Sequence, residues 1–289
     1  MLPHPDARSP RWLAGTAGIA VVAGLARHLL FRALEREAFV TRASPPGTDE
    51  PEASLRHSTF RSGNRVLHAA YAPAASMPAP ALIVYHGDDE CLPDWAPVQA
   101  MLSHAGISTF VFDYSGYGAS NGRPSVRRLR EDARAAYQVF LAATPDATRR
   151  YVLGHSLGSG VLLDVARELR PVPDGMIIGS GFSSARAAAV QTGRVPARLA
   201  WLLPDPWDNA ARMRRLDLPL LVLHSRNDEV LPLAHAERLA QAASRLHELV
   251  VFDGMPHDAA ILPEYIETFW APIIAFMLAQ HAQGTKSRQ

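Results

Sequence analysis

The chain has 289 residues, of which 48% are hydrophobic and 20% are charged, and its formal net charge is +1 at pH 7. This length fits one α/β domain of roughly 200–250 residues with an N-terminal extension. The balanced charge gives no reason to expect nucleic-acid binding, which needs clustered Lys and Arg. The single cysteine, Cys91, excludes an intrachain disulfide and a cysteine-rich zinc site.

The N-terminal segment, residues 1–43, carries an uncharged and largely apolar run at residues 12–26. This run is short for a membrane-spanning helix, which needs about 20 residues. Three interpretations stay open: a single membrane anchor, a cleaved signal peptide, and an amphipathic helix that lies on a membrane or on the domain. We expect the anchor, which predicts a membrane-associated protein of undetermined orientation. An exported or soluble protein is the alternative.

A polar stretch with several prolines and no periodicity follows at residues 44–53 and is typical of a linker. The sequence predicts one folded domain beyond it, over residues 54–282, and a short tail at 283–289. The domain begins with two extended runs, residues 58–61 and 65–71, which flank a turn sequence of Ser, Gly and Asn. Such an arrangement predicts a β-hairpin.

Short apolar runs then alternate with longer segments of helical periodicity. The apolar runs are residues 81–85, 109–112, 151–153, 176–178, 220–223 and 249–252, and the helical segments are 94–104, 126–143, 157–169, 234–244 and 263–281. Continuous apolar strands between helices predict an α/β fold with a mostly parallel sheet that is covered on both faces. The interval at about 182–216 is too long for a simple crossover, and we expect it to form a short cap.

The sequence Gly154-His155-Ser156-Leu157-Gly158 matches G-x-S-x-G. It directly follows a predicted strand and directly precedes a predicted helix, which is the context of a nucleophile elbow in the α/β-hydrolase fold. A turn this sharp strains the backbone at Ser156, and small flanking residues let strand and helix approach each other. The pattern therefore predicts that Ser156 is a nucleophile.

A serine hydroxyl is a weak nucleophile and needs a base that a third group holds in place. In this fold the partners follow the serine along the chain, first an acid and then a histidine, each in a loop after a strand. Asp228 and His257 occupy such positions. We expect His257 to transfer the proton and Asp228 to orient the imidazole. Glu229 and Asp253 are alternatives to Asp228, because the loop permits small register errors.

Two backbone N–H groups are expected to bind the negative charge that develops on the substrate oxygen. One is the N–H of Leu157, at the start of the helix after the nucleophile. The other comes from the loop that follows the run at 81–85 and opens with His86-Gly87, where Asp88 supplies the second N–H. Each such donor is typically worth about 10²–10³ in rate.

These motifs resemble the BEM46-like branch of the α/β-hydrolases, whose members are serine hydrolases. The residues that carry the resemblance, over about 58–277, are His86-Gly87, the block from Phe112 to Pro124 with its Asp-Tyr-x-Gly-Tyr-Gly-x-Ser core, the elbow, Asp228 and His257. The resemblance implies hydrolysis of carboxylic esters or thioesters in lipid-like or acylated substrates. It also implies an N-terminal membrane segment and no metal or cofactor.

The chain departs from the family pattern at two places. Asp88-Asp89-Glu90 stands where the family carries an uncharged run after the His-Gly pair. We expect these carboxylates to face solvent; a site that selects cationic substrates, or one of low activity, is the alternative. Ser115 replaces an arginine of the family, which we expect to loosen a structural ion pair. Cys91, close by, is expected to be a buried small residue and not a catalytic thiol.

The leading hypothesis is an enzyme that cleaves carboxylic esters or thioesters of apolar acyl substrates through an acyl-enzyme on Ser156. A peptidase or amidase with the same machinery is the nearest alternative. A catalytically silent, membrane-tethered binding module is the alternative from another class. Tyr114, Trp201 and Trp207 are the candidates for the substrate pocket. The expected partners are a small-molecule or lipid-like substrate and a membrane, and the oligomeric state is not readable.

Overall fold

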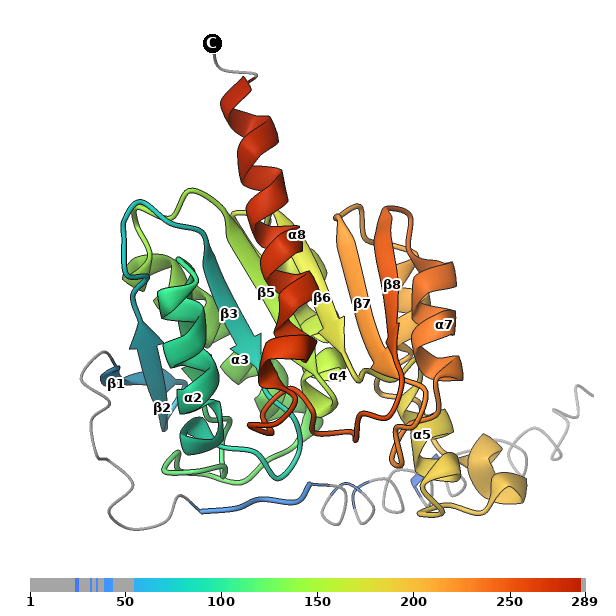
Figure 1. Cartoon of the computed structure of the whole chain (residues 1–289). Helices are drawn as coiled ribbons and strands as arrows, with labels where there is room; N and C mark the ends of the chain where they lie inside the picture. The colour runs from blue at the N-terminus through green and yellow to red at the C-terminus, as the bar shows by residue number, and fades with distance from the viewer. Residues whose placement is uncertain (1–23, 26–31, 33–34, 36–38, 44–54, 287–289) are drawn as a thin grey trace, which may run out of the picture.

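The computed structural model describes residues 24–25, 32, 35, 39–43 and 55–286 of the chain. Its centre is an eight-stranded sheet with the strand order β1-β2-β4-β3-β5-β6-β7-β8. Only the pairs β1–β2 and β2–β4 are antiparallel, so the predicted mostly parallel sheet is confirmed. Figure 1 shows the carboxyl ends of the parallel strands together at the lower edge of the sheet.

The hairpin at the start of the domain consists of β1 (Arg56–Ser62) and β2 (Arg65–Ala72). Ser62 pairs with Arg65, and Gly63 in the turn has φ of +60°, a left-handed conformation that glycine adopts without strain. The hairpin prediction is therefore confirmed, with β1 three residues and β2 one residue longer than the predicted runs.

The six parallel strands lie where the apolar runs predicted them. They are β3 (Ala81–Tyr85), β4 (Ser108–Phe112), β5 (Arg150–His155), β6 (Gly175–Gly179), β7 (Leu220–Ser225) and β8 (Leu246–Phe252). Their side chains are buried on both faces of the sheet, except in β8 and at the start of β5. Helices cover both faces, which is why the buried part of these strands is continuously apolar instead of alternating.

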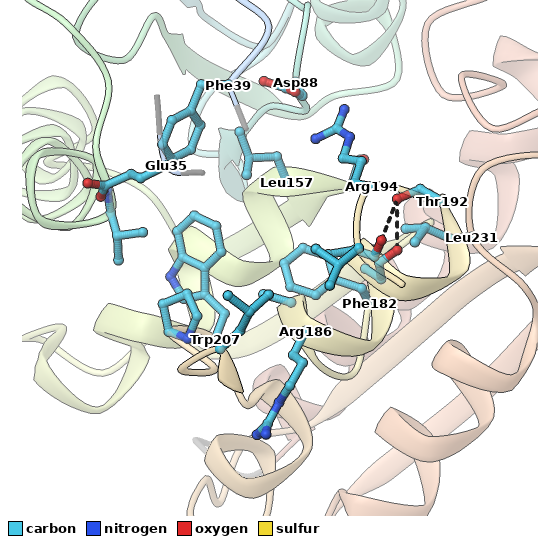
Figure 2. Close-up of a pocket in the computed structure, with 18 of the residues that line it drawn as sticks. Glu35, Phe39, Asp88, Leu157, Phe182, Arg186, Thr192, Arg194, Trp207 and Leu231 are labelled. Atoms are coloured by element: carbon cyan, nitrogen blue, oxygen red, sulfur yellow. Dashed lines mark hydrogen bonds between the residues drawn. The ribbon is translucent and has the colours of Figure 1, made fainter. Parts of the chain in front are cut away.

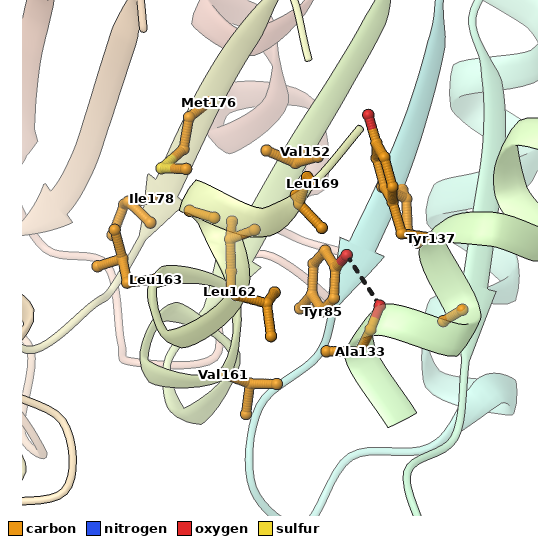
Figure 3. Packing of buried hydrophobic residues seen from close by; sticks show 14 of the residues in the cluster. Tyr85, Ala133, Tyr137, Val152, Val161, Leu162, Leu163, Leu169, Met176 and Ile178 are labelled. Atoms are coloured by element: carbon orange, nitrogen blue, oxygen red, sulfur yellow. Dashed lines mark hydrogen bonds between the residues drawn. The ribbon is translucent and has the colours of Figure 1, made fainter. Parts of the chain in front are cut away.

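Two hydrophobic cores lie on opposite faces of the sheet. The helices that cover it are α2 (Leu92–His104), α3 (Val126–Ala143), α4 (Leu157–Val165), α7 (Ala234–Ala242) and α8 (Ile266–Lys286). Side chains of α3, α4 and α7 pack in one core, part of which Figure 3 shows, and those of α2 and α8 pack in the other. Adjacent strand residues such as Ile83 and Val84 enter different cores, because successive side chains of a strand alternate between its faces.

The interval between β6 and β7 forms three short helices at the carboxyl-end edge of the sheet. They are α5 (Ala185–Gln191), η2 (Ala197–Leu202) and α6 (Asn209–Met213). The side chains of Ser184 and Asp208 accept hydrogen bonds from main-chain N–H groups in the first turns of α5 and α6, which explains where these two helices begin. This is the segment that the sequence predicted as a cap.

Most of the N-terminal run at residues 12–26 and the linker at 44–53 lie outside the described residues. Within the described part of the chain, no helix combines the length and apolarity that crossing a membrane requires. The membrane anchor stays a prediction. At the other end, α8 continues to Lys286, beyond the expected domain end at 282. Residues 282–286 show no apolar periodicity, which is why the sequence did not indicate this last turn.

Candidate active site

Ser156 lies at a sharp turn between β5 and α4. Its φ of 47° and ψ of −116° lie in a region that non-glycine residues rarely occupy. A Cβ on Gly158 would stand 1.8 Å from the Tyr85 carbonyl oxygen, and one on Gly154 would stand 2.8 Å from that of Gly158. The expected strain and the need for small neighbours are both confirmed.

The structure brings Ser156, His257 and Asp228 together. His257 Nε2 lies 2.8 Å from Ser156 Oγ, and His257 Nδ1 lies 2.8 Å from Asp228 Oδ2. Asp228 follows β7 and His257 follows β8. Because these strands are parallel, both side chains lie at the edge of the sheet where the elbow lies. This chain of hydrogen bonds is the geometry of a nucleophile, a base and an orienting acid.

The carboxylate of Asp228 is fully buried and held in one orientation. Its Oδ1 accepts hydrogen bonds from the main-chain N–H groups of Val230 and Leu231, at 2.9 and 2.7 Å. Burial alone would raise the pKa of Asp228, but the hydrogen bond and charge of His257 and the N–H of Leu231 lower it below its usual value. Asp228 is therefore ionised at neutral pH and can stabilise a positively charged imidazole.

Neither alternative to Asp228 contacts the imidazole ring. Glu229 accepts a hydrogen bond from the main-chain N–H of His257 at 3.1 Å, so it holds the backbone of that residue. Asp253 is exposed to solvent and pairs with Arg226. The loop register that places Asp228 at the ring is thus the one expected from the sequence.

A cavity of about 480 Å³ opens beside Ser156, a size typical of small-molecule sites. Its wall is mostly apolar, and Figure 2 shows Phe39, Leu157, Phe182 and Trp207 in it. Charged groups line it as well: Glu35, Asp88, Arg186 and Arg194. A wall of this composition suits an apolar group with a polar end.

Of the three pocket candidates, only Trp207 lies in the cavity wall. Tyr114 is fully buried, and its hydroxyl donates a hydrogen bond to the carbonyl oxygen of His86 at 3.1 Å, so it supports the loop and does not line the cavity. Trp201 is 72% exposed on η2 and does not line the cavity either. An aromatic residue in a motif or a cap indicates packing, but its sequence position does not tell which surface it faces.

The two expected oxyanion donors border the cavity together with Ser156. Leu157 is the first residue of α4, so its N–H has no acceptor within the helix. The positive end of the helix dipole at this point favours negative charge on a substrate oxygen. Asp88 lines the same cavity from the loop after β3.

The acidic loop does not have the orientation that we expected. Asp89 is exposed, but Glu90 is buried, and its carboxylate accepts hydrogen bonds from the Gly87 N–H at 2.7 Å and the Trp95 indole at 3.0 Å. Asp88 is half-buried, and its Oδ1 accepts a hydrogen bond from the Tyr117 hydroxyl at 2.5 Å. The expectation of three solvent-facing carboxylates is therefore wrong for Glu90, because internal donors compensate its burial.

Glu90 forms a buried ion pair with His155, the residue before the nucleophile. Glu90 Oε1 lies 2.7 Å from His155 Nδ1. Burial opposes charge on both groups, yet the mutual attraction leaves the pKa of Glu90 lowered and that of His155 raised. One carboxylate thus connects the oxyanion loop, residues 86–91, to the elbow.

Ser115, at the second departure from the family pattern, is part of an intact ion-pair network. Its hydroxyl accepts a hydrogen bond from Arg65 Nε at 2.7 Å, and Arg65 also pairs with Glu131 and Asp132. The expected loosening is therefore not observed, since β2 supplies the guanidinium. Cys91 is fully buried, as expected, and burial raises the pKa of its thiol to about 11.

Sequence reasoning missed Glu35 and Phe39, which lie in the segment predicted as an anchor and yet line the cavity. No motif marks either residue, because their contacts join positions far apart in the chain. Within the described residues, no group of three His, Cys, Asp or Glu side chains is arranged to hold a metal ion.

Comparison with known proteins gives matches along the chain. The family described as "Serine aminopeptidase, S33" matches residues 76–211. The uncharacterized protein Rv2307c of Mycobacterium tuberculosis is 35% identical over 182 residues, 62% of this chain and 63% of that protein. The lysophosphatidylserine lipase ABHD12 of Mus musculus is 31% identical over 159 residues, 50% of this chain and 40% of that protein. The chain therefore spans less than two thirds of the length of these relatives.

Solved structures share the fold at low sequence identity. A soluble variant of monoglyceride lipase from Saccharomyces cerevisiae has a TM-score of 0.63 at 13% identity and covers 82% of this chain and 98% of its own. Est1E from Butyrivibrio proteoclasticus has a TM-score of 0.62 at 18% identity and covers 78% and 99%.

The sheet, the elbow and the similarity to solved structures together show that the chain has the α/β-hydrolase fold. ABHD12 is among the proteins that the chain is similar to, and the resemblance to the BEM46-like branch stays a prediction.

Proposed function

We propose that the protein is a serine hydrolase that cleaves carboxylic esters or thioesters of apolar acyl substrates. One observation carries the proposal: the hydrogen-bonded chain Ser156–His257–Asp228 opens into a mostly apolar cavity. The shape of this site accepts an acyl chain beside the nucleophile.

In the proposed reaction, Ser156 Oγ attacks the acyl carbonyl carbon while His257 Nε2 takes the hydroxyl proton. The N–H groups of Leu157 and Asp88 bind the oxygen that becomes negative. His257 then gives the proton to the departing alcohol or thiol, which leaves an acyl group on Ser156. A water molecule releases the acyl group by the same steps, with His257 again as the base. Asp228 keeps the imidazole oriented throughout.

The wall of the cavity favours an ester over an aminopeptidase substrate. An aminopeptidase binds a free ammonium group, for which the cavity offers the carboxylates of Glu35 and Asp88. Glu35 accepts a hydrogen bond from the Val126 N–H, and Asp88 accepts from Tyr117 and from Val40. These donors take up part of the accepting capacity of both carboxylates and fix their orientation, which makes them less suited to bind an ammonium group. The relative ABHD12 is a lysophosphatidylserine lipase, which supports a lipid-like acyl ester as the substrate.

The silent binding module rested on acidic side chains that oppose an oxyanion. Glu90 is directed into its ion pair with His155 and Asp89 is exposed, so only Asp88 of the three borders the cavity, which weakens that hypothesis.

Labelling of the full chain with a fluorophosphonate tests the proposal, because the probe reacts only with an activated serine. Wild type is expected to label, whereas Ser156→Ala and His257→Ala are not. Hydrolysis of p-nitrophenyl esters, acyl thioesters and aminoacyl anilides then ranks the substrates, and esters or thioesters are expected to lead. A folded wild type that neither labels nor hydrolyses any of them would overturn the proposal.

A further inference from the structure

An extended segment of the N-terminal region, residues 39–43, lies against the oxyanion loop; we refer to it as the strap. Figure 1 shows it in blue, running past the carboxyl-end edge of the sheet. The N–H of Val40 donates to the Asp88 carboxylate at 3.0 and 3.1 Å, and the N–H of Asp89 donates back to the Val40 carbonyl at 2.9 Å. The main chain of the strap therefore holds two consecutive residues of the oxyanion loop.

Further contacts hold the strap on both sides of Val40. The Arg42 carbonyl accepts a hydrogen bond from the Gly118 N–H at 2.9 Å, and the Arg42 guanidinium pairs with Asp94 in α2. Before the strap, the Glu35 carboxylate accepts a hydrogen bond from the N–H of Val126, the first residue of α3, at 2.9 Å. These contacts attach the segment to three elements that surround the site.

The side chain of Phe39 contributes to the cavity itself. Its ring meets Trp207 edge-on, with 6.4 Å between the ring centroids, and both rings line the cavity. Figure 2 shows Phe39 directed toward the cavity from the side opposite to the cap helices. Phe39 and Trp207 thus bring the strap and the cap together around the space where an acyl chain would lie.

We propose that the strap is a positioning element of the active site, whose Val40 main chain holds the Asp88 N–H toward the substrate and whose Phe39 ring sets the length of acyl chain that the cavity accepts. The inference rests on the proposed function. Leu157 is held by the elbow and by the turn of a helix, whereas Asp88 lies in a loop whose carboxylate depends on donors from Val40 and Tyr117. Part of the oxyanion hole is therefore built by a segment that precedes the domain.

A pair of substitutions in the full chain isolates the main-chain contact. Val40→Pro removes the N–H that donates to Asp88, whereas Val40→Ala keeps it. Val40 is 44% exposed, so neither variant loses much side-chain packing, and the two differ in that donor and in the backbone restriction that proline places on residues 39 and 40. We expect kcat for p-nitrophenyl esters to be about 10–100-fold lower in Val40→Pro than in Val40→Ala, since one misplaced oxyanion donor costs up to about 10²–10³. The reduction should be the same for short and long acyl chains, with KM changed less than about twofold.

A second pair tests the side chain. Phe39→Ala opens the cavity wall, whereas Phe39→Leu keeps an apolar branch there. We expect KM for octanoyl and longer esters to be about 5–10-fold higher in Phe39→Ala than in Phe39→Leu, with little difference for acetyl esters, because the lost apolar contact weakens binding of the distal part of the chain. A strap that only stabilises the fold would not produce this dependence on chain length.

The outcomes separate the inference from the proposed function. If wild type hydrolyses no acyl substrate, the proposed function fails, and the strap with it. If wild type is active but Val40→Pro matches Val40→Ala and Phe39→Ala matches Phe39→Leu, the strap has no such role and the inference alone is overturned. Thermal unfolding shows whether Val40→Pro is folded; if it is not, the Phe39 pair decides the inference.

Discussion

The elbow and the oxyanion loop meet at the same reaction centre, yet different forces hold them. The elbow, Gly154–Gly158, carries a signal in its own sequence: a strained serine, two glycines, and the start of α4, although it is the Tyr85 carbonyl of β3 that requires glycine at 158. The oxyanion loop, residues 86–91, depends on contacts with residues far away in the chain, such as Val40 and His155. One half of the site is thus recognisable from a local motif, whereas the position of the other half depends on the assembled fold.

The largest effect is expected when a side chain is added in the elbow. In Gly158→Ala, the new Cβ would lie 1.8 Å from the Tyr85 carbonyl oxygen, which is main chain and must shift. A displacement of about 1 Å at a reaction centre can cost about 10²-fold in rate. We expect fluorophosphonate labelling to slow by at least that factor and the melting temperature to fall.

Gly106→Ala is the matched control for that substitution, because a Cβ on Gly106 meets no atom within 4 Å. Its φ of +81° still makes alanine costly there, so stability should fall by about 1 kcal/mol with an unchanged labelling rate. Equal labelling by Gly158→Ala and wild type would contradict the steric account of the elbow.

The next effect is expected in the oxyanion loop. Glu90→Gln removes the charge that pairs with His155, and breaking a buried ion pair typically costs about 3–5 kcal/mol. Since the loop then loses its link to the elbow, we also expect kcat to fall about tenfold. Chemical denaturation and ester kinetics measure the two effects, and the exposed neighbour Asp89→Asn serves as control. A stability equal to that of the control would show that the ion pair does not hold the loop.

A pH-dependent effect is expected at Asp113, a buried residue after β4. Its Oδ1 accepts a hydrogen bond from the Leu92 N–H at 2.9 Å and lies 3.8 Å from His86 Nε2. Burial raises its pKa to about 7 in the folded protein. Because the folded state favours the protonated form, this stabilisation is complete below about pH 4 and is lost as the pH rises through 7.

Asp113→Asn should abolish that dependence. Between pH 4 and 7, the unfolding free energy of wild type relative to the variant is expected to fall by up to about 1.4 kcal/mol per pH unit. Urea denaturation at several pH values measures the slope. Parallel profiles for the two proteins would mean that Asp113 is ionised across this range.

The smallest effect is expected for Tyr114→Phe. The substitution deletes the hydroxyl that donates to the His86 carbonyl and leaves the ring in the core. A lost hydrogen bond of this kind costs about 1 kcal/mol, and we expect kcat to fall no more than a few-fold. KM should not depend on chain length in the variant, because Tyr114 does not line the cavity. A rise of KM for long acyl chains alone would show that Tyr114 does contact the substrate.

The fold was predictable because each element carries its own signal. The helix predicted over 126–143 is α3, and the apolar run at 81–85 is β3, without any shift of their ends. Candidate residues at the elbow and after β7 and β8 were predictable as well, since consecutive parallel strands place their following loops at one edge of the sheet.

The cavity and the acidic loop were not predictable in the same way. Trp201 and Trp207 lie six positions apart in one cap, yet one is 72% exposed and the other is buried in the wall. Glu90 was expected to face solvent, but in the folded protein His155, Trp95 and the Gly87 N–H surround its carboxylate. The burial of each of these side chains depends on contacts with residues that are distant in the sequence.

Local patterns predicted the chain order of strands and helices, the strained turn at Ser156 and the candidates Asp228 and His257, because periodicity, small residues and chain order can be recognised in short stretches of sequence. The folded arrangement was needed to show that the strap borders the cavity, that Glu90 is paired in the interior, and that Trp207 and not Trp201 lines the pocket. The physical reason is that hydrogen bonding and burial depend on partners about 50 or more residues away, as between Val40 and Asp88 or between Glu90 and His155.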